Sequence, residues 1–254
     1  MPMPGEDGGR SMTGRIFVVL EVLAQATAPM TLSDVSRRAE LPLTTTHRML
    51  ADLVEVGAVE KGERGYRLGE RVWRLGAASQ WDAEMRRAAA PHAHALARET
   101  GAAVAVAALT GDRLMCIDTI RGRSAAVLLT RSGQRLPILA TSAGKVLLAT
   151  VAQHLVPRML SQPIRRSTRF TPVLPKLVLD QLAKARRLGY ATAYEEEAEG
   201  QSSVSVRIET GPGQAPMTLT ALVPGARRTL SSLVPDLRQT AAAIGRSIVA
   251  VQPG

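Results

Sequence analysis

Cysteine and aromatic residues are both scarce in this chain. Among its 254 residues there is one cysteine, Cys116, so no disulfide can form within the chain, and this usage suits a cytoplasmic protein. Aromatic residues make up 3% of the sequence, too few for the stacking platforms that bind single-stranded nucleic acid. No stretch approaches the roughly 20 apolar residues of a membrane span, so we expect no membrane partner.

The first ten residues, MPMPGEDGGR, are rich in proline and glycine. They lack the apolar core of a signal peptide, so we expect residues 1–10 to form a disordered tail. The structured part of the chain is then expected to begin at Ser11.

Residues 31–57, TLSDVSRRAELPLTTTHRMLADLVEVG, have the pattern of a helix, a tight turn and a second helix. Thr31 can cap the first of these helices. Pro42 suits the start of the second, where its missing N–H costs nothing, and Gly57 marks the end. A further helix should precede them, because apolar residues recur there at i, i+3, i+4 and i+7: Ile16, Val19, Leu20 and Leu23.

The last of these helices has two distinct faces. The residues that repeat the same apolar spacing, and should face the core, are Thr46, Met49, Leu50 and Leu53. Thr44, Thr45 and Arg48 then lie on the opposite side, free to meet a base edge or a phosphate. Such a helix pair can place a recognition helix in the major groove of DNA, although a small helical bundle with a polar face would show the same pattern.

The residues that follow favour DNA binding. Ala58–Lys61 and Tyr66–Leu68 read as two short strands, joined by a turn at residues 62–65. A hairpin directly after a recognition helix is a wing. Its basic residues, which could reach phosphates or the minor groove, are Lys61, Arg64 and Arg67.

Net charge supports this interpretation only weakly. The chain carries a formal charge of +10, which suggests a polyanionic partner. Residues 10–74, however, hold ten Lys or Arg and eight Asp or Glu, while residues 75–254 hold 22 and 12. The excess therefore lies outside the expected DNA-binding domain. We interpret it as solvated surface that aids the approach to DNA, not as a second nucleic-acid site.

Beyond a helix expected at residues 70–80, strands and helices alternate. The expected strands are Val104–Leu109, Leu114–Ile120, Ala125–Thr130, Tyr190–Tyr194, Ser203–Ile208 and Met217–Val223. The expected helices are Met85–Glu99, Thr141–Ala152, Lys176–Leu188 and Leu230–Val249. Strands in hairpins, with helices gathered on a face, indicate an α+β fold around a mostly antiparallel sheet.

Two later segments, QRLPILATSAGKVLLA and RRLGYATAYEEEAEG, contain LP…GK.LLA and G…EEE..G at a characteristic separation. With the helix-turn-helix and the wing they make the chain, from about Ser11 to Val249, resemble the IclR-type bacterial transcriptional regulators. The resemblance implies a winged helix-turn-helix DNA-binding domain at residues 11–69 and a linker helix at residues 70–83. It implies a GAF/PAS-like α+β domain at residues 84–254 that binds an effector and oligomerises.

The resemblance also implies partners. Members of that family dimerise, often pair into tetramers, and bind palindromic or repeated operators as repressors or activators. The expected partners are therefore double-stranded operator DNA, a small-molecule effector and further copies of this chain, as a homodimer or homotetramer. We expect a ligand-responsive repressor without a cofactor, whose operator affinity changes when the effector binds.

The DNA-contacting residues follow from the match of residues 43–48 to the start of the family's recognition helix. The contacts implied there are Leu43, Thr44, Thr45, His47 and Arg48, with Arg37 and Arg38 on phosphates and Lys61, Arg64 and Arg67 on the wing. His47 could equally be a solvated helix histidine.

In similar proteins the effector pocket is built from the sheet, the loop that enters the LATSAGK helix and the strand after EEE..G. The matching residues are Leu139, Thr141, Ser142, Ala143, Ser202, Ser203 and Val204. Free N–H groups at the start of that helix would suit an effector carboxylate.

This chain departs from the family pattern at several of these positions. Leu139 stands where a histidine is common, Ala193 and Tyr194 where acidic residues are common, and Ser203 where a cysteine is frequent. The last strand reads TALV where related binders of small oxo acids tend to carry serines. These changes predict an effector that is larger and more apolar than a short oxo acid, such as an aromatic or aliphatic acid.

The alternative from another functional class is an enzyme. Ser142 and Lys145 match the S-x-x-K nucleophile motif of penicillin-recognising enzymes, but the chain has no Lys-Thr-Gly or Ser-Asp-Asn. The alternative is therefore a hydrolase based on these two residues, without its usual partners. No metal site is expected, because His92 and His94 point to different faces of a helix and no other ligand cluster accompanies them.

Overall fold

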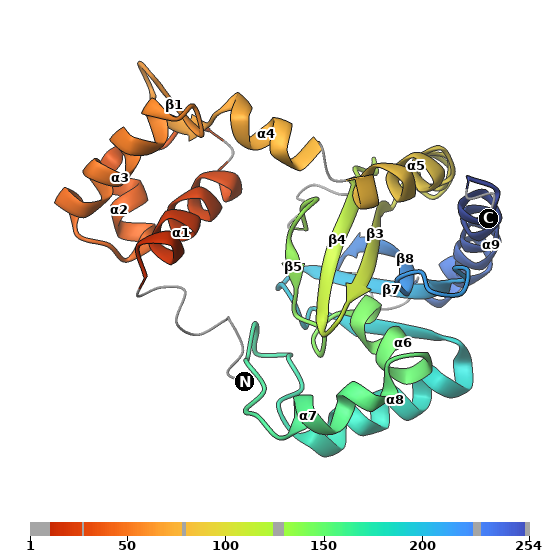
Figure 1. The fold of residues 1–254 in the computed structure, drawn as a ribbon. Coiled ribbons are helices and arrows are strands. Elements are labelled where there is room, and N and C mark those ends of the chain that lie inside the picture. Colours follow the sequence, from red (N-terminus) through yellow and green to blue (C-terminus); the bar gives the residue numbers. More distant parts are fainter. Residues whose placement is uncertain (1–10, 27, 78–79, 124–129, 226–229, 252–254) are drawn as a thin grey trace. The chain divides into compact units, whose positions relative to one another are not determined.

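The computed structural model divides the chain into two compact units, one up to Gln80 and one from Trp81 onward (Figure 1). It describes residues 11–26, 28–77, 80–123, 130–225 and 230–251. The expected tail at residues 1–10 and nearly all of the strand expected at residues 125–130 lie outside the described residues. Within the described part, no helix is long and apolar enough to cross a membrane.

The first unit consists of helices followed by a two-stranded antiparallel hairpin. In chain order its elements are α1 (Met12–Gln25), α2 (Leu32–Ala39), α3 (Leu43–Glu55), β1 (Val59–Gly62), β2 (Gly65–Leu68) and α4 (Glu70–Ala77). The winged helix-turn-helix expected from the sequence is confirmed.

Local signals set the boundaries of these helices. The Thr31 hydroxyl accepts a hydrogen bond of 3.2 Å from the Asp34 N–H and so caps α2. Glu40 adopts a left-handed conformation with φ 55° and makes the turn between α2 and α3. Gly57 also adopts a left-handed conformation, with φ 70°, and follows the end of α3. The wing is attached to the helices because Met30 forms a β-bridge with Tyr66, and both side chains are buried.

The expected inner face of α3 is confirmed. Thr46, Met49, Leu50 and Leu53 are all buried, and the three apolar side chains pack in one core with α1, α2 and the wing. Since this core fixes the rotation of α3, it also determines which side chains α3 exposes.

Among the described residues, the second unit is built on an antiparallel sheet of six strands in the order β5-β4-β3-β8-β7-β6. The strands are β3 (Ala103–Thr110), β4 (Arg113–Ile120), β5 (Arg135–Leu136), β6 (Tyr190–Tyr194), β7 (Gln201–Ile208) and β8 (Met217–Pro224). The helices are α5 (Gln80–Thr100), α6 (Ser142–Thr150), η1 (Gln153–Leu155), α7 (Val156–Leu160), α8 (Pro175–Leu188), η2 (Ser231–Leu233) and α9 (Val234–Val251). The expected α+β class is confirmed.

Helices cover both faces of this sheet, which gives a three-layer unit (Figure 1). Because strand side chains alternate, β3 directs Val104, Val106 and Ala108 toward α5 and α9. It directs the intervening alanines toward α6 and α8. The short strand β5 and the helix α7 were not expected from the sequence, since neither is long enough to show a clear period.

Gly144, in the first turn of α6, allows the preceding loop to lie directly against the helix. A Cβ atom at this position would lie 1.9 Å from the Ile138 carbonyl oxygen. The Ile138 carbonyl oxygen belongs to the backbone, and a Cβ atom is attached directly to the backbone of α6. Neither could therefore move away as the end of a flexible side chain can. Only glycine therefore fits between the Pro137–Ile138 loop and α6.

We expect Gly144→Ala to lower the free energy of unfolding by about 3 kcal/mol, because the added methyl forces the loop away from α6. Gly211→Ala is the matched control, since its Cβ would meet side-chain atoms no closer than 3.5 Å. Urea denaturation of both variants measures the difference. Equal stability of the two would contradict the close approach.

Candidate functional site

The outer face of α3 carries the side chains expected to meet DNA. Leu43 is 49% exposed, Thr44, His47 and Arg48 are exposed, and Thr45 is half-buried. Thr46 is buried, and its hydroxyl donates to the Pro42 carbonyl at 3.1 Å. Of the three consecutive threonines, Thr44 is therefore the most accessible to a partner.

The cations expected to contact DNA fall into two groups. Arg37 pairs with Asp34 at 2.5 Å, and on the wing Arg67 pairs with Glu60 at 2.6 Å. Lys61 lies over the Tyr66 ring, 5.8 Å from its centroid. Within the described residues Arg38, Arg48 and Arg64 are exposed and form no ion pair. These three can bind a phosphate or base without first breaking an internal contact.

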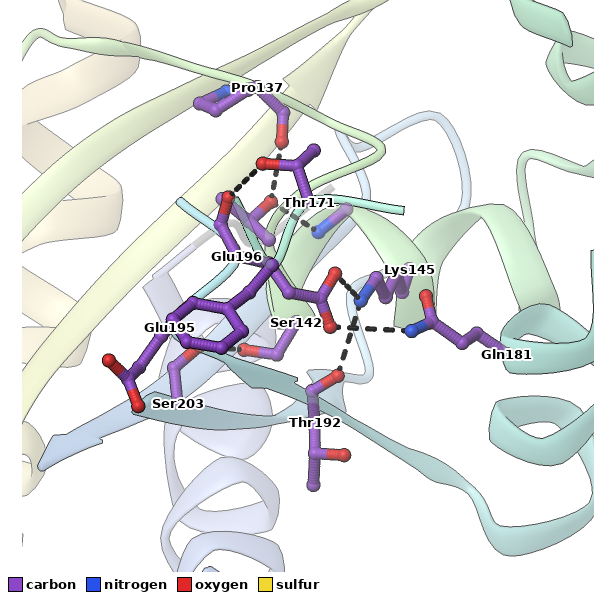
Figure 2. Close-up of polar contacts among 12 residues, drawn as sticks. Pro137, Ser142, Lys145, Thr171, Gln181, Thr192, Glu195, Glu196 and Ser203 are labelled. Atoms are coloured by element: carbon purple, nitrogen blue, oxygen red, sulfur yellow. Dashed lines mark hydrogen bonds and ion pairs between the residues drawn. The ribbon is translucent and has the colours of Figure 1, made fainter. Parts of the chain in front are cut away.

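In the second unit, a chain of buried hydroxyl groups joins α6 to the sheet. Ser142 Oγ lies 2.8 Å from Ser203 Oγ and 2.7 Å from Ser205 Oγ (Figure 2 shows the contact with Ser203). Ser205 Oγ lies 2.7 Å from the hydroxyl of Thr220 on β8. All four residues are buried. Each hydroxyl can act as donor or acceptor, so the chain can reorient to suit a polar ligand.

The start of α6 is a potential anion site beside these hydroxyls. The Thr141 hydroxyl accepts from the Gly144 N–H at 3.2 Å and donates to the Pro137 carbonyl at 3.1 Å. This cap leaves the N–H groups of Ser142 and Ala143 without an acceptor among the described residues. Ala143 is buried and Leu139 half-buried, so the surroundings are largely apolar.

Two of the expected effector residues do not join this group. Ser203 and Ser205 face α6, but the alternation along β7 directs Val204 into the core formed with α5 and α9. Ser202 has the same orientation as Val204, because its cross-strand neighbours Tyr194 and Val223 pack against that core. The structure therefore places Ser202 and Val204 on the opposite face of the sheet from Ser142.

A buried ion pair lies one helical turn further along α6. Lys145 Nζ binds Glu196 Oε2, and the two side chains are 1% and 5% exposed (Figure 2). Nζ also donates to the Thr192 carbonyl at 3.4 Å, and Gln181 Nε2 donates to Glu196 Oε1 at 3.3 Å. The Glu196 carbonyl accepts from the Thr171 hydroxyl at 2.7 Å. The pair thus connects α6 with α8, β6 and the turn that precedes β7.

Burial dominates the electrostatics of these groups. Desolvation lowers the pKa of Lys145 and raises that of Glu196, while their mutual attraction acts in the opposite direction on each. Burial alone raises the pKa of Glu197 to about 7. It also raises the pKa of Cys116 to about 11, which favours the protonated thiol at neutral pH.

The contacts of Ser142 and Lys145 do not support the hydrolase alternative. A serine nucleophile needs a base within hydrogen-bond reach. Ser142 Oγ binds Ser203 and Ser205, whereas Lys145 Nζ binds Glu196 and the Thr192 carbonyl. The two residues of the S-x-x-K match therefore belong to different polar networks.

Sequence reasoning missed several residues of these networks. Ser205 could have been found, because it follows Ser203 with the two-residue period of a strand face. Thr220, the first residue of the TALV segment that departs from the family's serines, also contributes, because its hydroxyl contacts Ser205. Glu196 belongs to the EEE..G motif, but local sequence patterns do not pair it with Lys145, which lies 51 positions earlier in the sequence.

Both units match known protein families. Residues 13–63 match the IclR helix-turn-helix domain, and residues 78–246 match the C-terminal domain of bacterial transcriptional regulators of the IclR type. The first implies DNA binding, and the second implies binding of a small-molecule effector.

Individual relatives agree with these matches. The chain is 30% identical to the probable transcriptional regulator SauR of Cupriavidus necator, over 85% of this chain and 86% of that protein. It is 28% identical to the repressor AllR of Escherichia coli, over 89% and 84%.

A solved structure of an IclR homologue from Microbacterium hydrocarbonoxydans, in complex with 4-hydroxybenzoate, shares 30% identity with a TM-score of 0.78. The match covers 94% of this chain and all of that one. The fold, the family matches and the relatives agree, and the chain belongs to the IclR family of bacterial transcriptional regulators.

Proposed function

We propose that this protein is a repressor whose affinity for its operator changes when a small, largely apolar organic acid binds the second unit. The observation that carries the proposal is the buried hydroxyl chain at the start of α6, next to two backbone N–H groups that have no acceptor among the described residues. It offers polar anchors within a largely apolar surrounding, as a ligand pocket requires.

Operator recognition is assigned to α3 and the wing. Arg48 and Thr44 are exposed on the face of α3 opposite the core, where they can reach base edges in the major groove. Arg38 and Arg64 would bind phosphates, and Arg37 and Arg67 would do so only after releasing their carboxylate partners. Each copy offers few cations that lack an internal partner among the described residues. We therefore expect tight binding to require a dimer that occupies two half-sites.

The proposed effector has a carboxylate and an apolar body. The carboxylate would accept from the N–H groups of Ser142 and Ala143, and the hydroxyls of Ser142 and Ser203 would complete its shell. The body would lie toward Leu139 and the face of the sheet that carries Leu222 and the alanines of β3. A relative that binds 4-hydroxybenzoate supports an aromatic acid as the effector class.

Regulation requires that the effector distinguish two arrangements of the DNA-binding units. A ligand shifts an equilibrium only by its difference in affinity for the two states. In an oligomer, an effector that favours one arrangement would alter the separation of two α3 helices and so the fit to the operator. The repressor AllR among the relatives supports this direction of control.

We expect Arg48→Ala to weaken specific binding of the full-length protein to DNA upstream of its own gene by about tenfold or more, since one charged base or phosphate contact is lost. Arg113→Ala, an exposed arginine of the second unit, is the control for lost charge. Gel-shift titration at fixed salt measures both. Operator affinity that survives unchanged in Arg48→Ala would remove this residue from the interface.

We expect Ser203→Ala to lower affinity for an aromatic acid such as 4-hydroxybenzoate by about fivefold to tenfold, because an anchoring hydroxyl is lost. Ser202→Ala is the matched control, with the same change one residue earlier on the opposite face. Isothermal titration calorimetry measures both variants, with glyoxylate as a second ligand. Binding of glyoxylate but not of the aromatic acid would overturn the proposed effector class.

A further inference from the structure

A second pocket lies at the outer edge of the sheet, between α8 and the edge strand β6. It has a volume of about 140 Å³. One water molecule occupies about 30 Å³ in the liquid, so the pocket has room for several waters or one small ligand. Its inner wall contains Lys145, Glu196 and Gln181, and Lys184 and Tyr190 lie nearer its mouth. None of the four hydroxyl-chain residues lines it.

The inner wall presents one acceptor that lacks a donor. Gln181 Nε2 donates to Glu196 Oε1 at 3.3 Å, which fixes the orientation of the amide because its oxygen would be repelled by the carboxylate. Gln181 Oε1 is buried and has no hydrogen-bond partner in the part of the chain that the structure describes. A buried acceptor left unpaired costs free energy, so a ligand with a donor group is favoured at this point.

The same wall presents a donor that is not fully used. The Lys145 ammonium has three N–H groups, of which one is directed to Glu196 Oε2 and one to the Thr192 carbonyl. The third has no acceptor among the described residues. Its position on the pocket wall makes it available to an acceptor atom of a ligand.

The charge around the pocket favours an anion. Lys145 and Glu196 neutralise each other, whereas Lys184 is exposed at the mouth and forms no ion pair within the described part of the chain. The lining therefore carries one uncompensated positive charge. An anionic ligand would be attracted there, and its charge would lie between Lys184 and the third N–H of Lys145.

We propose that this pocket is a second ligand site, separate from the effector site, which takes a small hydroxycarboxylate. Its carboxylate accepts from Lys145 and pairs with Lys184, and its hydroxyl donates to Gln181 Oε1. The site depends on neither DNA binding nor the identity of the effector. Since Lys145 follows Ser142 by three positions on α6, a ligand here contacts the same helix that carries the hydroxyl chain.

Three small probes test the proposed chemistry on the full-length protein by calorimetry. Glycolate has both groups, acetate lacks the hydroxyl, and ethylene glycol lacks the carboxylate. We expect glycolate to bind in the millimolar range or tighter, and at least about fivefold more tightly than either of the others. Absence of glycolate binding at millimolar concentration, or equal binding of all three probes, would overturn the proposal.

Variants locate the binding. Gln181→Leu should weaken glycolate binding about fivefold to tenfold. Lys184→Gln should also weaken it, and this change at an exposed position leaves the core intact, so it tests the site even if Gln181→Leu unfolds. Lys176→Gln, an exposed lysine of α8 outside the pocket, should bind as the unchanged protein does. Loss of binding in Ser203→Ala but in neither pocket variant would place glycolate in the effector site and refute the second site.

Discussion

The buried ion pair between Lys145 and Glu196 is the contact on which the arrangement of the second unit depends. Two charges in an interior are costly, and they are tolerated only when their attraction and further hydrogen bonds offset the lost hydration. Here Gln181 donates to the Glu196 carboxylate and the Thr192 carbonyl accepts from Lys145, while the Thr171 hydroxyl holds the backbone carbonyl of Glu196. The pair therefore connects α6, α8, β6 and the turn at residues 195–200, which are far apart in sequence, through one polar network (Figure 2).

This connection explains how the proposed effector site is held in place. Ser142 and Lys145 lie one turn apart on α6, and Glu196 precedes Ser203 by a single turn and the start of β7. Fixing Lys145 against Glu196 therefore helps to hold Ser142 beside Ser203, in addition to their own hydroxyl contact of 2.8 Å. Gly144 contributes from the other side, because it lets the Pro137–Ile138 loop lie against the same helix. The polar anchors are positioned by rigid elements and not by mobile loops, which favours a preorganised site.

The sequence allowed the fold class and most elements to be predicted, because both depend on local patterns. The spacing of Thr46, Met49, Leu50 and Leu53 determined the outer face of α3, and alternation in the apolar segments revealed most strands of the sheet. The family resemblance predicts effector residues near the start of α6, but it does not separate Ser203 from Ser202 and Val204. That distinction depends on the register of β7 in the sheet. The pairing of Lys145 with Glu196 could not be inferred from local patterns either, since it depends on tertiary contacts across 51 positions.

The most direct test of this central role is a double-mutant cycle on the ion pair, with Lys145→Met and Glu196→Gln made singly and together. The free energy of unfolding of each variant is measured in urea. The affinity for an aromatic acid is measured as well, because it depends on how Ser142 and Ser203 are positioned. We expect each single change to cost about 3–5 kcal/mol, because it leaves a buried group without its partner, and the double change to cost clearly less than their sum. Additive losses, with effector affinity unchanged throughout, would contradict the role assigned to the pair.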